Sequence, residues 1–387
     1  MEDWKRAGLG SAGAMFVAMG LGRFSYGAMV PALVSAGHLG ADQAGWVGGI
    51  NLGGYFIGAF LSDGLRRRYS MTRVLGVCVL ISLISLAASA LPWGFAWLAW
   101  WRGLVGVTAG VIMVLAISLT TEAAPADKRA QAAGLLFSGV GVGIFFSGVL
   151  VPWLLQTGIA AAWSGIAAVG AFGAGLAWVG WRGLHAPVDT SPMRHGVARL
   201  LGAGPHRYGL AAAYFLFSFG ITPHTLYWVD FLVRGLDMGL TVAGTHWATV
   251  GIFAVLGPLA SAWFARRTET SYAVVVAFLV LGAGIAAPAL AVFVPMLWLS
   301  TIIFGAQPGV TTVTAARARD LTDGETIASL MRVLIMSSAV GAAVGGIAFP
   351  AMFAIAERYD LLFAVGGGAM FLAAAFTFPR RVKSPAA

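Results

Sequence analysis

Long apolar stretches separated by short polar connections run along the whole chain. A helix needs about 20 apolar residues to cross the hydrocarbon core of a bilayer. The first six stretches of that kind lie at residues 8–35, 43–62, 73–92, 95–120, 131–155 and 160–181. The second six lie at residues 208–233, 241–264, 271–291, 294–316, 327–352 and 359–378. The pattern predicts twelve transmembrane helices in two sets of six.

Composition excludes a water-soluble class. Hydrophobic residues make up 59% of the 387 positions, charged residues only 10%, and the mean hydropathy is +0.85. A soluble domain carries about 25% charged residues, so the surplus apolar side chains must face lipid. The 53 glycines suit helices that approach one another closely in a bilayer. The single cysteine, Cys78, cannot form an intrachain disulfide, and we interpret the apolar N-terminal segment as a retained span rather than a signal peptide.

The basic residues predict how the chain is oriented. Most of the 24 lysines and arginines fall into the connections that share one side when the N-terminus is placed inside. Positive residues accumulate on the cytoplasmic side of bacterial and other inner membrane proteins. We therefore expect a multi-pass protein of the inner membrane with both termini in the cytoplasm. The net charge of +9 then reflects topology and requires no nucleic-acid partner.

The two sets of spans resemble each other, which indicates an internal duplication. Phe24–Gly27 in the first span matches Phe217–Gly220 in the seventh, and the glycine-rich tract 142–152 matches 340–350. The basic pair that follows the second span recurs after the eighth. Parallel repeats of this kind, with a substrate site between them near the midplane, occur in transporters. The predicted units are an N-terminal bundle (1–181), a cytoplasmic linker (182–207) and a C-terminal bundle (208–387).

The connection after the second span, residues 61–68, carries an acidic residue followed by a basic pair. Asp63, Arg67 and Arg68 in that order resemble the loop signature of the major facilitator superfamily, although Ala59 and Arg66 replace two of its glycines. The resemblance implies the major facilitator fold, an all-α membrane protein with two pseudo-symmetric six-helix bundles. It also implies a cytoplasmic gate.

In that gate Asp63 would accept backbone donors from the start of the eleventh span, and Arg67 would pair with Glu122. Arg68 completes the basic pair. The alternative is that the arginine cluster only enforces topology.

Further motifs support the same resemblance over the whole chain. Arg102 followed by Gly106 resembles a second superfamily motif, while the fifth span lacks the Gly-Pro pair of similar antiporters. Export of the drug-antiport kind is therefore not supported. The segments 20–27, 43–46 and 51–59 resemble the YbfB/YjiJ-like branch, which implies a transporter but no particular substrate.

Three arginines fall inside the predicted spans, where a charge costs roughly 2.5–3.5 kcal/mol on insertion scales. They are Arg23, Arg102 and Arg332. The sequence places no carboxylate near the midplane that could balance their positive charges. Guanidinium groups bind carboxylates, sulfonates and phosphonates through paired hydrogen bonds. The three arginines are therefore candidate ligands for an anion. The alternatives are a structural bond to backbone carbonyls for Arg23, a proton relay or the same kind of structural bond for Arg102, and snorkelling for Arg332.

Other polar residues in the spans complete the candidate site. His224 is the candidate proton carrier because imidazole titrates near neutral pH, with a purely structural role as its alternative. Asp230, which we group with it for proton coupling, has Arg234 one turn later as its expected ion-pair partner. The remaining candidate ligands, for which interhelical hydrogen bonds are the alternative, are Asn51, Tyr55, Tyr227 and Gln307.

Taken alone, the sequence predicts a monomeric secondary transporter for a small organic anion, working by alternating access, with proton coupling through His224. Its partners are the small-molecule substrate and membrane lipid, and we expect no cofactor or metal. The alternative is a proton-driven exporter of hydrophobic or cationic compounds, which would need an unpaired acid near the midplane. A membrane enzyme is not supported, because the six histidines show no metal-binding or acyl-transfer spacing.

Overall fold

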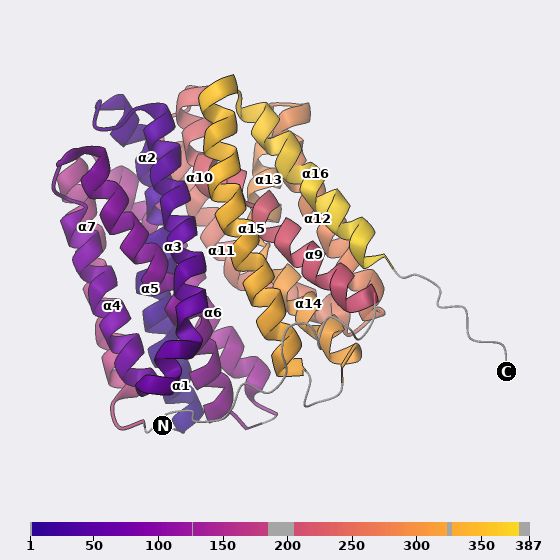
Figure 1. Cartoon of the computed structure of the whole chain (residues 1–387). Helices are drawn as coiled ribbons and strands as arrows, with labels where there is room; N and C mark the ends of the chain where they lie inside the picture. Colours follow the sequence, from indigo (N-terminus) through magenta and orange to yellow (C-terminus); the bar gives the residue numbers. More distant parts are fainter. Residues whose placement is uncertain (1, 126, 185–204, 323–326, 379–387) are drawn as a thin grey trace.

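The computed structural model describes residues 2–125, 127–184, 205–322 and 327–378, and these residues form helices and connections without strands (Figure 1). In the N-terminal half the helices are α1 (Asp3–Met15), η1 (Phe16–Arg23), α2 (Ser25–Ser35), α3 (Ala41–Arg68), α4 (Met71–Ala88), α5 (Gly94–Ala123), α6 (Arg129–Leu154) and α7 (Ile159–Trp181). In the C-terminal half they are α9 (Pro205–Gly220), α10 (Thr222–Asp230), η2 (Phe231–Gly235), α11 (Leu240–Ala265), α12 (Thr270–Leu290), α13 (Val294–Gly305), α14 (Pro308–Asp320), α15 (Ile327–Ala356) and α16 (Tyr359–Thr377).

These helices account for the twelve predicted spans. Within the described residues ten are long and apolar enough to cross a membrane, and the pair α13 and α14, bent by 42°, makes an eleventh. The seventh predicted span is present as α9, α10 and η2, interrupted at Ile221. The prediction of an all-helical fold of the twelve-helix type is confirmed.

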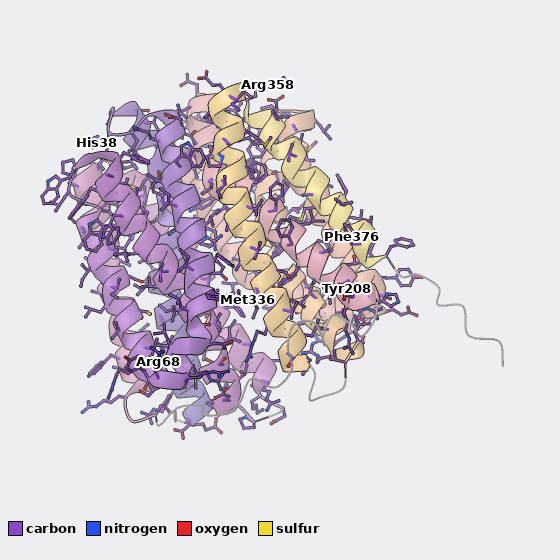
Figure 2. All side chains as sticks on the ribbon, in the orientation of Figure 1. His38, Arg68, Tyr208, Met336, Arg358 and Phe376 are labelled. Atoms are coloured by element: carbon purple, nitrogen blue, oxygen red, sulfur yellow. The ribbon has the colours of Figure 1, made fainter. Side chains whose placement is uncertain are left out.

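Helices α1 to α7 gather on one side of the molecule and α9 to α16 on the other (Figure 1). Most of the predicted linker (182–207) lies outside the described residues. Arg68 lies at the same end as the N-terminus, and we call this end the basic end (Figure 2). His38 and Arg358 lie at the opposite end.

The two halves pack tightly near the opposite end, where glycines allow backbones to approach. A Cβ added at Gly49 of α3 would overlap the carbonyl oxygen of Gly346 on α15. Helices α6 and α11 meet in the same way, with Gly148 against Gly244. These contacts seal the interface between the halves on the side away from the basic end.

Candidate transport site

Arg23 is the last residue of a π-helical segment, η1, that interrupts the first span. Its guanidinium lies over the ring of Tyr55, 5.0 Å from the centroid, and 5.5 Å from the centroid of Phe24. The side chain is partly exposed, and its Nε has no hydrogen-bond partner. Among the described residues no carboxylate pairs with it. Aromatic faces attract a guanidinium without neutralising it, so Arg23 keeps its charge available for an anion.

Arg102 occupies a different environment, completely buried within the N-terminal half. Its Nη1 donates a 2.8 Å hydrogen bond to the carbonyl oxygen of Gly22, and its guanidinium lies 4.9 Å from the ring centroid of Trp163. Asn51 donates from Nδ2 to the carbonyl oxygen of Arg102 at 2.7 Å. For Arg102 this geometry supports the structural alternative, a bond to a backbone carbonyl. For Asn51 it supports the alternative of an interhelical hydrogen bond.

Arg332 lies near the basic end, away from Arg23. Its Nη1 is 3.7 Å from Oδ2 of Asp63, and its side chain is 53% exposed. Asp63 follows Tyr55, the neighbour of Arg23, by eight residues on α3, which is about 12 Å along a helix. The structure thus joins Arg332 to the predicted gate instead of to Arg23.

The gate itself differs in detail from the prediction. Glu122 pairs with Arg66, at 2.9 Å, and not with Arg67, so that expectation was wrong. Arg66 follows Ala59 by seven residues and so shares its helix face. Ala59 packs against Gly110 of α5, the helix that carries Glu122 near its end. Arg67 and Arg68 are exposed.

Asp63 faces α15, as the prediction required, but its contact there is the Arg332 side chain. It follows Gly49 and Leu52 by 14 and 11 residues, which places all three on one face of α3. Both of these residues pack against Gly346 of α15. Among the described residues, then, a side-chain ion pair joins the two halves at the position where backbone donors were expected.

Asp230 is buried and fully partnered. Arg234 donates to both of its carboxylate oxygens, at 2.6 and 2.7 Å, which confirms the ion pair predicted from their spacing. Tyr359 of α16 donates a further 2.7 Å hydrogen bond to Oδ2. Tyr227 is also buried, and its unpartnered hydroxyl points at Gly45 across the interface between the halves.

His224 is completely buried within the C-terminal half. Its Nε2 lies 2.8 Å from Oγ of Ser300, while its Nδ1 has no partner and its ring stacks on Trp228. A second histidine, His246, makes the equivalent contact with Thr301 at 2.7 Å. The sequence analysis did not predict this second pair. The adjacent polar residues Ser300 and Thr301 in an apolar span could have indicated it. Gln307 lies apart, at the bend between α13 and α14.

A cavity of about 660 Å³ lies between helix ends of the N-terminal half, close to His38 at the opposite end. Its walls are largely apolar and come from α2, α5, α7 and the connections that follow α2, α4 and α6, with Leu240 added from the other half. None of the candidate ligands lines it. The candidate anion ligand Arg23 thus lies outside this cavity.

Known structures of similar fold are transporters. The D-xylose–proton symporter matches with a TM-score of 0.77 and 16% identity over 97% of both chains. A bacterial homologue of the human lysosomal transporter Spinster, inward-facing and unoccupied, matches with a TM-score of 0.69 and 16% identity, covering 97% of this chain and 95% of that one. At this identity the likeness establishes the fold.

Curated relatives match over shorter segments. The 3-(3-hydroxy-phenyl)propionate transporter of Escherichia coli is 34% identical over 29% of each chain. The niacin transporter NiaP of Acinetobacter baylyi is 31% identical over 34% of this chain and 29% of its own. A putative metabolite transport protein of Haemophilus influenzae is 31% identical over 42% of this chain and 39% of its own. The chain thus aligns with well under half of the length of these relatives.

A family model covers nearly the whole chain. It is described as "Uncharacterised MFS-type transporter YbfB" and matches residues 15–378. Those residues include both halves of the fold and every candidate ligand named above. The chain therefore belongs to the YbfB-like family of MFS-type transporters and is a transporter, not an enzyme.

Proposed function

We propose that this protein moves a small organic anion, such as a carboxylate, sulfonate or phosphonate, across the inner membrane by alternating access. The observation that carries the proposal is Arg23, a cation within the first span that lacks a carboxylate partner among the described residues. A guanidinium binds such oxyanions through two parallel hydrogen bonds. The negative charge of the substrate would then serve as the counter-ion of Arg23.

The neighbours of Arg23 favour an aromatic carboxylate within this class. Its guanidinium lies over the buried rings of Phe24 and Tyr55, so the charge is held in an aromatic environment. Two curated relatives carry molecules of this chemistry, 3-(3-hydroxyphenyl)propionate and niacin. Both compounds pair one carboxylate with one aromatic ring.

The basic end is proposed to face the cytoplasm, in agreement with the placement of lysine and arginine. The glycine contacts at the opposite end then close the path toward the outside. On that orientation Asp63 and Arg332 join the halves on the cytoplasmic side at 3.7 Å. The Asp63–Arg332 pair then closes the cytoplasmic side more loosely than the glycine contacts close the outer side.

Export of cationic compounds is the less supported alternative. A cationic substrate would need an unpaired carboxylate inside the membrane. Asp230, which is buried in the seventh span, is already bound by Arg234 and Tyr359. Within the described spans, the unpaired guanidinium of Arg23 and the occupied carboxylate of Asp230 support an anionic substrate over a cationic one.

Thermal unfolding of the purified protein in detergent tests the proposal directly. The panel contains nicotinate, 3-(3-hydroxyphenyl)propionate, an aryl sulfonate, an aryl phosphonate and a lipophilic cation. A ligand at 100 times its Kd stabilises the folded state by about 2.7 kcal/mol. We expect a member of the anion set to raise the Tm of the wild type.

The matched variants are Arg23→Ala, which should lose this shift, and Arg358→Ala, which should keep it. Arg358 is an exposed arginine paired with Asp360 at the opposite end, so its removal changes the net charge equally without touching the site. Stabilisation by the lipophilic cation alone, or an anion shift that survives Arg23→Ala, would refute the proposal.

A further inference from the structure

The π-helical turn of the first span is held in place by side chains at the point where it ends. A π-helix is rare, and short π segments occur mostly at functional sites. Here the N–H of Phe24 bonds to the carbonyl oxygen of Met19, five residues earlier, at 3.1 Å. The regular helix α2 begins immediately afterwards, at Ser25. Arg23 is therefore presented by the last residue of the irregular turn.

Two side chains satisfy the carbonyl groups at this junction. Arg102 donates to the carbonyl oxygen of Gly22 at 2.8 Å, and the hydroxyl of Ser25 donates to that of Leu21. Both donors are completely buried. Irregular backbone persists inside a protein only where the surroundings over-determine it, and these two bonds supply that constraint. Space is also limited, since a Cβ at Gly22 would lie 2.9 Å from Cγ1 of Val105 on α5.

The bond from Arg102 is part of a closed circuit of contacts. Asn51 on α3 donates to the carbonyl oxygen of Arg102 on α5, and Arg102 donates to Gly22 in η1. Tyr55, one turn after Asn51 on the same face of α3, lies beneath the guanidinium of Arg23. These contacts thus hold both the backbone of Arg23 and the ring of Tyr55 in place relative to α3 and α5.

Burial explains why Arg102 is suited to this role and not to ligand binding. None of its side-chain surface is exposed, and one of its faces is occupied by Trp163. A charge buried at such a place is costly unless it satisfies polar groups around it. The carbonyl oxygen of Gly22 accepts from its Nη1, while its Nε and Nη2 have no hydrogen-bond partner among the described residues.

We propose that Arg102 is a positioning residue, which together with Ser25 locks the π-helical turn of the first span so that Arg23 points at the substrate path. This inference rests on the proposed function of Arg23 as anion ligand. If the lock is removed, the turn relaxes toward α-helix. The segment then rotates about its helix axis, and a neighbouring side chain takes the orientation that Arg23 now has. Phe24, now 5% exposed, would turn toward the path as Arg23 turns away.

Thiol accessibility measures this rotation without any substrate. In a Cys78→Ser background, Arg23→Cys and Phe24→Cys are labelled separately with a cationic methanethiosulfonate reagent from the basic end, in inverted membrane vesicles. The readout is the ratio of the two labelling rates. We expect position 23 to react faster in the otherwise native chain. Arg102→Gln and Ser25→Ala should each lower the ratio at least tenfold.

Two further variants separate positioning from general damage. Arg102→Lys keeps a donor for Gly22 and should restore the ratio in large part, whereas Ser118→Ala removes a comparable hydroxyl bond, to Val114 in a regular part of α5, and should leave it unchanged. A ratio that stays the same in both Arg102→Gln and Ser25→Ala overturns the proposal. Should Arg102→Gln fail to fold, Ser25→Ala decides alone. Because no ligand is used, a changed ratio combined with anion binding that survives Arg23→Ala would contradict only the ligand role of Arg23.

Discussion

Replacing Gly49 by alanine should force the sealed end of the transporter open. In the structure a Cβ at this position would overlap the carbonyl oxygen of Gly346 and lie 2.9 Å from its carbonyl carbon. Carbon atoms in ordinary contact are about 3.5–4.0 Å apart. Helices α3 and α15 must therefore separate, and neither backbone can move aside within its own helix.

The size of the effect follows from packing costs. Overpacking of a well-packed contact costs about 1–3 kcal/mol. This cost falls only on the state in which α3 and α15 touch, so the equilibrium moves toward the state open at the opposite end by about 5- to 150-fold. Gly53→Ala is the matched control, because a Cβ there has no neighbour within 4 Å.

Accessibility of a buried interface position reports the shift. Leu226, which is 7% exposed, covers Gly48 at this interface. Leu226→Cys in a Cys78→Ser chain would be labelled in intact cells with a membrane-impermeant maleimide. Labelling should accelerate in the Gly49→Ala chain by the factor given above and stay constant in the Gly53→Ala chain. Equal labelling rates in the two glycine variants, with both proteins folded, would refute the packing argument.

Three further predictions concern charged and polar groups. Asp230→Asn removes the charge of the buried carboxylate that binds the partly exposed Arg234, and it should lower the free energy of unfolding by about 1.5–3 kcal/mol, measured by thermal unfolding; a loss below 1 kcal/mol contradicts this. Asp63→Asn removes a long, half-exposed pair with Arg332 that contributes at most about 1 kcal/mol, so stability should hardly change. Exchange rates across the membrane should nevertheless change if this pair is a gate, and unchanged exchange argues against that role. His224→Gln keeps a polar contact for the buried hydroxyl beside it but cannot carry a proton, so substrate exchange should continue while pH-driven accumulation stops; accumulation that persists excludes this residue as the carrier.

Much of the fold was accessible from sequence because hydrophobic length alone determines whether a helix can span a bilayer. The spacing of charged residues along a helix also predicted a contact correctly. The pair of Asp230 and Arg234 follows from their i, i+4 separation, and the structure forms it. Asn51 was predicted as a candidate ligand with an interhelical hydrogen bond as the alternative, and it bonds to the backbone of Arg102.

The gate shows where sequence spacing was insufficient. Arg66 and Arg67 are adjacent, and the choice between them depends on which face of α3 packs on α5. That face is defined by close backbone contacts such as Ala59 with Gly110, which become visible only when the helices are docked. The same holds for Arg332, whose pairing with Asp63 depends on how α15 is placed against α3.

The π-helical turn is a second feature that the sequence pattern did not predict. Apolar residues surround the segment 16–23, and its composition suits an ordinary transmembrane helix as well. The irregular turn depends on partners far away in the chain, above all the donor that Arg102 supplies to Gly22. Position within the span singled out Arg23 as a candidate, but it did not predict the backbone geometry that presents this residue.

Uptake into proteoliposomes tests the central claim, transport of an organic anion through Arg23, most directly. Purified wild type, Arg23→Ala and Arg358→Ala would be reconstituted in parallel and given radiolabelled nicotinate or 3-(3-hydroxyphenyl)propionate, whichever stabilises the wild type more strongly. The account predicts saturable uptake by the wild type and Arg358→Ala, with uptake by Arg23→Ala reduced to the level of empty liposomes. Wild-type uptake that Arg23→Ala fully retains would contradict it.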